Sequence, residues 1–358
     1  MKLFVLGLLL ILTNSAFGQK KQLNIYTDER IELLNTIQYL SDYPILNQSD
    51  SLEYKKTIDK YFKNYKNHSA VILNKNISST FFSFDRPINF ILHYKLPEFE
   101  LIKPFTENEL TSLNASNSQD TLNLIVNEFK KFYAETKFNE FYKSNSKFYN
   151  KLKEPVIIEL RKYDIVATLE DHYKIKNQSY NILVSPLLHE GGYAVDISIK
   201  GKHNLFAIIG PSYGKTNKLP VFDAKTILSQ YTLHEMSHSF CNPIIDSNWN
   251  EFTKLDCLYK PIETAMKEQG YSEWKTCLYE HLVRANEIIL SEIIFGKQRA
   301  DEIKSEYINN KKWIYLDDFI SVIKNNYLAN KQKYKSQNDI IPLIINKLEG
   351  RKKTADNN

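Results

Sequence analysis

Residues 234–238 read His-Glu-Met-Ser-His, which puts two histidines four positions apart and a glutamate directly after the first. Residues four apart on a helix lie on the same face, roughly 6 Å from each other. His234 and His238 can therefore hold one metal ion between them. Neutral imidazole suits Zn²⁺, and Glu235 beside that ion can accept a proton from a zinc-bound water. The motif predicts a helix that carries a zinc site.

The residues around the motif favour a helix of limited length. We expect it to run from Asp223 to about Cys241 and to end at Asn242-Pro243. The competing interpretation is two histidines on a helix surface, or in a satisfied core, with no metal. The apolar flank that favours the helix consists of Ile227, Leu228 and Tyr231.

A catalytic zinc site takes three protein ligands and a water, so one ligand remains to be found. The extended metzincin pattern would need glycine at position 241 and histidine or aspartate at 244. The chain has Cys241 and Ile244, which excludes that pattern. Asp246 is close in sequence but lies beyond Pro243, out of the register of the motif. The third ligand is therefore expected from another part of the chain.

The best candidate for that ligand is Glu280, 42 residues after His238 in an otherwise apolar helical stretch. Arg284 and Glu287 follow at intervals of about one turn, so three charges form a stripe on this helix. A helix packed inside a protein carries such a stripe only where it is paired or bound. A structural row of ion pairs is the alternative, and Glu287 or His281 could replace Glu280 as the ligand.

A first helix with HExxH and a second helix that supplies a glutamate resemble the gluzincin metallopeptidases. More narrowly, HEMSHSFCNP and the later YEHLVRA resemble an uncharacterised bacterial family of exported metallopeptidases. The likeness runs over most of the chain, including ELLNTIQYL and SPLLHEGGYAV. It implies one zinc ion held by His234, His238 and Glu280, with Glu235 as the catalytic base.

The resemblance also implies a tyrosine or histidine that stabilises the reacting oxyanion, for which Tyr193 and His281 are the candidates. We assign Arg284 to substrate binding. Gluzincins bind peptides along a sheet edge beside the motif helix, and the strand at 203–209 is expected to be that edge. His189-Glu190-Gly191-Gly192 could form a second metal site, but its glycine pair favours a turn between strands.

The pattern of apolar residues predicts an α+β fold that is mostly helical. A small antiparallel sheet, with strands near 180–187, 193–199 and 203–209, is expected beside the active-site helix. The N- and C-terminal regions are expected to be helical, the latter including a long helix from Ser272 to Phe295. The expected parts are a signal peptide at 1–18, a helix-rich region at 19–155 that packs on the catalytic part, a zincin-like region at 156–350 and a disordered tail at 351–358.

The N-terminus predicts export. Lys2 precedes an apolar run from Leu3 to Leu12, and Ala16 and Gly18 form a cleavage site before Gln19. The run is too short for a permanent membrane helix, which needs about 20 residues, although an uncleaved anchor is the alternative. We expect a secreted or periplasmic protein with no stable membrane insertion after cleavage.

Charge and cysteine content give no support for nucleic-acid binding or for a zinc ribbon. Loss of Lys2 lowers the net charge from +5 to +4, and the lysines are spread along the chain, which gives no support for nucleic-acid binding. The three cysteines, Cys241, Cys257 and Cys277, match no zinc ribbon and allow at most one disulfide. We expect buried thiols without chemistry.

These features together predict an exported zinc metallopeptidase that hydrolyses peptide bonds through a zinc-bound water activated by Glu235. Its partner would be a peptide or protein substrate. One alternative is an exported binding or scaffold protein with a degenerate or structural zinc site. Another is a zinc hydrolase that acts on a non-peptide amide. The sequence leaves the oligomeric state open.

Overall fold

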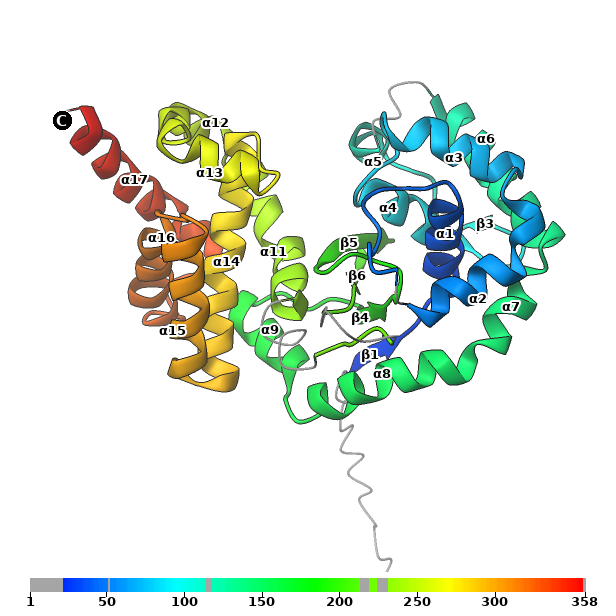
Figure 1. Cartoon of the computed structure of the whole chain (residues 1–358). Coiled ribbons are helices and arrows are strands. Elements are labelled where there is room, and N and C mark those ends of the chain that lie inside the picture. The colour runs from blue at the N-terminus through cyan, green and yellow to red at the C-terminus, as the bar shows by residue number, and fades with distance from the viewer. Residues whose placement is uncertain (1–21, 51, 114–117, 213–218, 224–230, 357–358) are drawn as a thin grey trace, which may run out of the picture.

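The computed structural model describes residues 22–50, 52–113, 118–212, 219–223 and 231–356 (Figure 1). The expected signal peptide at 1–18 lies outside the described residues. About 62% of the structure is helical, with a small mixed sheet and a separate antiparallel pair of strands. The expected α+β, mostly helical fold class is confirmed.

The main sheet has four strands in the order β1-β4-β6-β5. β1 and β4 are parallel, β4 and β6 are parallel, and only β5 and β6 are antiparallel. The sheet is therefore mixed and not the antiparallel sheet expected from the sequence. The strands are β1 (Leu23–Tyr26), β4 (Ser179–Val184), β5 (Gly192–Ile199) and β6 (Lys202–Ile209).

Chain order explains this difference. β5 and β6 form a hairpin whose turn residues Lys200 and Gly201 both have positive φ, of 51° and 73°, as tight hairpin turns require. The hairpin places β6 next to β4, and β5 becomes an edge strand. β1 comes from the other end of the chain and adds to β4, so it was not recognised as part of the sheet.

The first part of the chain forms an N-terminal lobe, which we define as α1 to α7 with β2 and β3. Asp28 caps α1 by accepting a hydrogen bond from the backbone N–H of Arg30 at 2.9 Å. The elements from α1 to α9 are α1 (Glu29–Leu40), α2 (Glu53–Tyr61), a 3-10 turn (Lys63–Tyr65), α3 (Ser69–Ser78), α4 (Arg86–Leu92), β2 (Tyr94–Lys95), β3 (Glu100–Leu101), α5 (Glu107–Ser112), α6 (Ser118–Glu135), α7 (Phe138–Ser144), α8 (Ser146–Leu160) and α9 (Ile165–Tyr173).

The rest of the chain, after the sheet, is almost entirely helical. Gly296, with a φ of 87°, ends the long helix α14 close to where the sequence predicts. The elements are α11 (Leu233–Ser247), α12 (Trp249–Phe252), 3-10 turns (Thr253–Leu258 and Lys260–Ile262), α13 (Glu263–Glu268), α14 (Trp274–Phe295), α15 (Lys297–Ser305), a π-helical segment (Glu306–Asn310), α16 (Leu316–Val322), a second π-helical segment (Ile323–Leu328), a 3-10 turn (Gln337–Ile340) and α17 (Ile341–Asp356).

The sheet separates two hydrophobic cores, and its strands alternate between them. Ile182 and Ala207 face the core of the C-terminal helices, whereas Leu183 and Ile208 face the core of the N-terminal lobe. Figure 1 shows the sheet between the N-terminal lobe and the pair α11 and α14. The expected boundary between residues 155 and 156 is wrong, because α8 crosses it and β1 belongs to the shared sheet.

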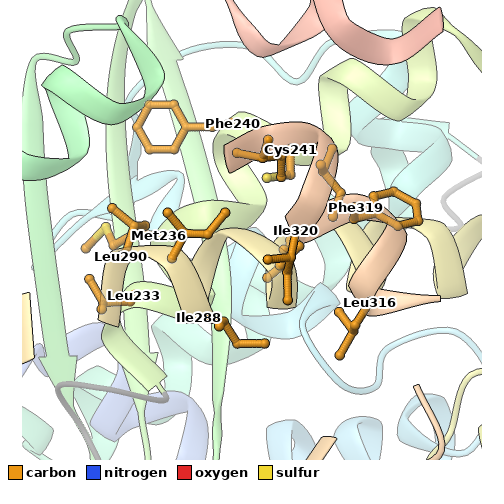
Figure 2. Packing of buried hydrophobic residues seen from close by; sticks show 14 of the residues in the cluster. Leu233, Met236, Phe240, Cys241, Ile288, Leu290, Leu316, Phe319 and Ile320 are labelled. Atoms are coloured by element: carbon orange, nitrogen blue, oxygen red, sulfur yellow. The ribbon is translucent and has the colours of Figure 1, made fainter. Parts of the chain in front are cut away.

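Helix α11 carries the HExxH motif and packs with its apolar side on α14, in a buried cluster that also contains residues of α16 (Figure 2). It does not end at Pro243 as expected but continues to Ser247. The proline removes one backbone hydrogen bond. Ile245, which lies beyond the proline, is fully buried in the C-terminal core, and this packing offsets the loss. The residues labelled in Figure 2 are Leu233, Met236, Phe240 and Cys241 of α11, Ile288 and Leu290 of α14, and Leu316, Phe319 and Ile320 of α16.

Other expectations about the C-terminal region have different outcomes. The start of the motif helix falls on residues 224–230, outside the described residues. Helix α17 continues through Arg351 to Asp356, so the expected disordered tail is wrong for those residues. All three cysteines are free thiols; Cys241 and Cys277 are buried and Cys257 is exposed. No helix among the described residues is long and apolar enough to span a membrane.

A buried carboxylate in the N-terminal lobe ties α1 to the loop after β4. Glu32 is fully buried and accepts hydrogen bonds from Ser185 Oγ at 2.6 Å and from Tyr54 OH at 2.9 Å. Burial raises the pKa of Glu32 to about 7, although these two hydrogen bonds act to lower it. In the unfolded chain the carboxyl titrates at its ordinary pKa, near 4.3. Folding therefore favours the protonated form.

We predict that the parent protein loses stability between pH 5 and pH 8 and that Glu32→Gln abolishes this loss. The folded protein holds this proton more tightly, so stability falls as pH rises between the unfolded and folded pKa values. The difference amounts to about 2–3 kcal/mol. Denaturant unfolding should show Glu32→Gln more stable than the parent at pH 8 and similar at pH 5. Exposed Glu154→Gln is the control, and an identical pH profile for parent and Glu32→Gln would contradict the assignment.

Candidate metal centre

Helices α11 and α14 bring three side chains to one point. His234 and His238 project from successive turns of α11, and Glu280 projects towards them from α14. One ligand atom from each lies within 4.8 Å of the other two, and together they could hold a metal ion. This is the trio that the sequence resemblance implies.

The distances within the trio are nearly equal. The two Nε2 atoms of His234 and His238 are 3.2 Å apart, and each lies 3.4 Å from an oxygen of Glu280. Two ligand atoms that each lie about 2.1 Å from one tetrahedral metal ion stand roughly 3.4 Å apart. His234 faces Oε2 of Glu280 and His238 faces Oε1, so the carboxylate spans both rings at close to the spacing of tetrahedral ligands.

The far side of each imidazole is held by a hydrogen bond. His234 Nδ1 lies 3.0 Å from the carboxylate of Glu287, and His238 Nδ1 lies 3.1 Å from the amide oxygen of Asn242. Both partners accept, so Nδ1 carries the hydrogen in each ring and both Nε2 lone pairs point at Glu280. With both rings neutral, these two lone pairs and the carboxylate of Glu280 would converge on one buried point, where a cation would balance them.

The charges around the trio also favour a cation at this point. Burial lowers the pKa of His234, but the carboxylates of Glu280 and Glu287 outweigh it and raise the pKa to about 10. Burial alone would raise the pKa of Glu280, yet Arg284 and the two histidines hold it well below its usual range. Burial lowers the pKa of His238 to about 4, so this ring stays neutral. The field at the trio therefore favours one added positive charge, and the donor set fits a metal ion.

Glu287 is a partner of the trio and not a ligand. Besides His234, its carboxylate accepts from Tyr307 OH at 2.9 Å, and it is fully buried. The alternative in which Glu287 replaces Glu280 is wrong. Neither Glu287 nor Asn242 was assigned this role from the sequence. The signal for Asn242 was available, because it follows His238 by four positions on the same helix face.

Arg284 does not face the cleft as the expected substrate-binding residue would. Its Nη2 lies 2.9 Å from Glu280 and donates to Tyr271 OH at 3.1 Å. The guanidinium also lies 4.5 Å and 4.7 Å from the ring centres of Tyr307 and Trp313. Arg284 therefore pairs with the same Glu280 oxygen that faces His234, and the expected ion pair between Arg284 and Glu280 is present without extending to Glu287.

His281 cannot contact a reacting oxyanion, because it points into the C-terminal core. Its side chain is fully buried, Nδ1 lies 2.7 Å from the carbonyl oxygen of Cys277, and the ring packs against Trp313 and Phe319. One position along a helix rotates a side chain by about 100°, so the neighbour of Glu280 leaves the ligand face. The assignment of His281 to the site, as ligand or as oxyanion stabiliser, is wrong.

A cleft of about 750 Å³ opens over the trio. Its lining comes from helices α11 and α14, from the edge strand β5, from the N-terminal lobe and from the segment that joins α13 to α14. The cleft is lined by Ile45, Phe84, Asp85, His189, Gly192, Tyr193, Ala194, Asp196, His234, Glu235, His238, Ser239, Asn242, Pro243, Gln269, Gly270, Tyr271, Thr276, Tyr279 and Glu280.

Glu235 lies in this cleft beside the trio. Burial raises its pKa to about 7, with His234 acting to lower it and Glu280 to raise it. Strand β5 passes so close that a Cβ atom on Gly192 would come within 3.0 Å of the Glu235 side chain and 2.9 Å of Ile208 O. A glycine at this position therefore lets the sheet edge approach the carboxylate. Tyr193 also lines the cleft, but its neighbours place it against the N-terminal core.

The remaining sequence candidates lie elsewhere. The strand β6 is interior to the sheet, so the edge beside the motif helix is β5 and not residues 203–209. Asp246 is exposed on α11 and pairs with Lys275 at 2.6 Å, which agrees with its exclusion as a ligand. The stretch from His189 to Gly192 leads from a loop into β5, and Gly191 there has a φ of 117°.

Comparison with known proteins identifies the family but no relative of known activity. Residues 23–347 match the family model described as "Domain of unknown function (DUF4932)". No curated protein and no solved structure matches the chain. Because the match spans most of its length, this chain belongs to the DUF4932 family.

Proposed function

We propose that this chain is an exported zinc metallopeptidase, with zinc held by His234, His238 and Glu280 and with Glu235 as the general base. The observation that carries the proposal is the convergence of those three ligand atoms beside a buried carboxylate at the floor of an open cleft. Export rests on the N-terminal sequence at 1–18 alone.

The choice of zinc rests on the donor set. Two imidazole nitrogens and one carboxylate oxygen form the His₂Glu set that is common in catalytic zinc sites. A site for Mg²⁺ or Ca²⁺ would be made of oxygen atoms, and a site for Cu⁺ would contain sulfur. Cys241, the thiol on the motif helix, is buried; it accepts from Asn286 Nδ2 and lies 3.9 Å from Tyr173 OH, and it does not line the cleft.

The number of ligands favours a catalytic over a structural site. Structural zinc sites are closed by four protein ligands, whereas catalytic sites keep one position open. Among the described residues, three groups of the ligating types converge here, and the cleft adjoins them. This is the argument against the alternative of a binding or scaffold protein with a structural zinc ion.

Zinc, Glu235 and strand β5 have separate roles in the proposed reaction. When bound, zinc acts as a Lewis acid that polarises a carbonyl oxygen and lowers the pKa of water beside it. Glu235 removes a proton from the attacking water and returns it to the leaving amine nitrogen as the C–N bond breaks. Among the described residues β5 has no strand partner on its outer side, next to Glu235, and an extended peptide can add there as a further strand. This edge favours a peptide over a small non-peptide amide.

Tyr271 is a better candidate than Tyr193 for stabilising the oxyanion. It lines the cleft, and its phenol oxygen accepts from Arg284 Nη2 at 3.1 Å. Because arginine only donates, the hydrogen of the phenol stays available for another acceptor. Tyr193 faces the N-terminal core across the strand from Glu235.

We predict that Glu235→Gln loses peptide hydrolysis by about 10³-fold or more, since a general base contributes 10²–10⁴-fold. Zinc content should not change, because Glu235 is not a ligand. Product analysis by mass spectrometry on peptide libraries, with zinc content measured in parallel, tests this, and exposed Glu268→Gln is the control. Equal rates for parent and Glu235→Gln would refute the mechanism. A zinc protein that cuts only non-peptide amides, or nothing, would favour one of the alternatives.

We predict that Tyr271→Phe lowers kcat by about 10²-fold with little change in KM, as expected for a donor used only in the transition state. Tyr193→Phe, in the same cleft, should change kcat by less than about threefold by the same reasoning. Steady-state kinetics on one cleaved peptide measures both. A larger loss of kcat in Tyr193→Phe than in Tyr271→Phe would instead assign oxyanion stabilisation to Tyr193.

We predict that Glu287→Gln weakens zinc binding by about 10- to 100-fold, because the carboxylate orients His234 and raises its basicity. Competition with a coloured chelator measures the affinity. Glu292→Gln, on the same helix but paired with Lys324 away from the trio, should bind zinc as the parent does. Unchanged affinity in Glu287→Gln would show that this contact does not support the site.

A further inference from the structure

A second pocket lies beside the cleft and shares part of its lining. Its volume is about 350 Å³, and the shared residues are Asp196, Ser239 and Pro243. Ser239 directly follows the ligand His238 on α11. This volume is at the lower end of the range for ligand pockets, about 300–1,000 Å³, which suits one large side chain.

The surface of this pocket is mainly apolar. Ile175, which is 42% exposed, and the half-buried Ile244 form two walls, together with the shared Pro243. Phe240 forms the floor and stacks on Tyr173 with ring centres 4.2 Å apart. Exposed apolar side chains that gather around a cavity beside an active-site cleft indicate a binding surface.

The one carboxylate that lines the pocket already has a partner. Asp196 lines both the pocket and the cleft, and one of its oxygens lies 2.7 Å from His203 Nδ1. The rest of the pocket lining carries no acidic group, and most of its exposed surface is apolar. The pocket therefore favours an uncharged apolar group over a lysine or arginine side chain.

Two independent distances place the pocket relative to the reacting bond. Pro243 lies five residues after His238 on α11, a rise of roughly 7.5 Å. Asp196 lies four residues after Gly192 on β5, roughly 13 Å further along the edge. A peptide extended along β5 advances about 3.3 Å per residue. A side chain two to four residues from the cleaved bond would therefore lie over the pocket.

We propose that this pocket is a specificity subsite that takes one large apolar side chain of the peptide, two to four residues from the cleaved bond. The inference rests on the proposed function, because the peptide must lie along β5. It adds the substrate class, namely extended peptides with an aromatic or long aliphatic residue at that distance.

The test uses variants that change the pocket without touching the zinc site. Ile175→Glu places a charge on the apolar wall, and Ser247→Trp fills the space from an exposed position on α11. Ile158→Glu is the matched control, because Ile158 is 59% exposed on α8 and lines neither space. Polar ten-residue peptides carry phenylalanine, alanine or lysine at one position two, three or four residues from the mapped cleavage site.

For the zinc-loaded parent and Ile158→Glu we expect kcat/KM to favour phenylalanine over alanine by about 10- to 100-fold at one of these positions. In Ile175→Glu and Ser247→Trp the preference should fall to within about threefold. Binding of the same peptides to the Glu235→Gln background, measured by fluorescence anisotropy, should show the same order of affinities without any cleavage.

The outcomes separate the two proposals. Cleavage without an apolar preference at these positions, or a preference that survives in both pocket variants, overturns the subsite and leaves the peptidase intact. A preference for lysine also overturns it. If no peptide is cut or bound by any of these proteins, the proposed function fails, and the subsite fails with it.

Discussion

The contact between helices α11 and α14 is the constraint on which the rest of the site depends. It brings two histidines, three carboxylates and one guanidinium together at the floor of the cleft. Burying such groups is costly unless they are paired, and five of the six are: Glu287 pairs with His234, Asn242 with His238 and Arg284 with Glu280. The Nε2 atoms of the two histidines and the carboxylate of Glu280 face one another, and a metal ion between them would add positive charge beside these carboxylates.

The remaining architecture brings a substrate surface to that point. The sheet separates two cores, so β5 is supported on one face by the N-terminal lobe while its edge passes over the motif helix. Gly192 allows this approach, because a side chain there would collide with Glu235. The N-terminal lobe adds Phe84, an exposed aromatic residue with a φ of 59°, to the rim of the cleft. The lobe therefore lines part of the cleft as well as supporting the sheet.

Part of the metal site could be predicted from local patterns in the sequence. The spacing of His234 and His238 follows from helix geometry, and Glu280 stood out as a charge in an apolar helix. Sheet order was missed because β1 is four residues long and pairs with a strand about 150 residues away. The side on which His281 and Arg284 lie depends on the packing of α14 against Trp313 and Tyr307, which lie later in the chain. Residue propensity alone also predicted that α11 ends at Pro243. The helix continues past this residue because Ile245 is buried in the core.

The central claim is that one zinc ion binds His234, His238 and Glu280 and keeps a coordination position free of protein. The most direct measurement is a crystal structure of the zinc-loaded protein with anomalous diffraction data collected at the zinc absorption edge. We expect one strong peak about 2.0–2.2 Å from both Nε2 atoms and from an oxygen of Glu280, with no fourth protein ligand. A peak at another site, a fourth protein ligand or no peak at the trio would contradict it.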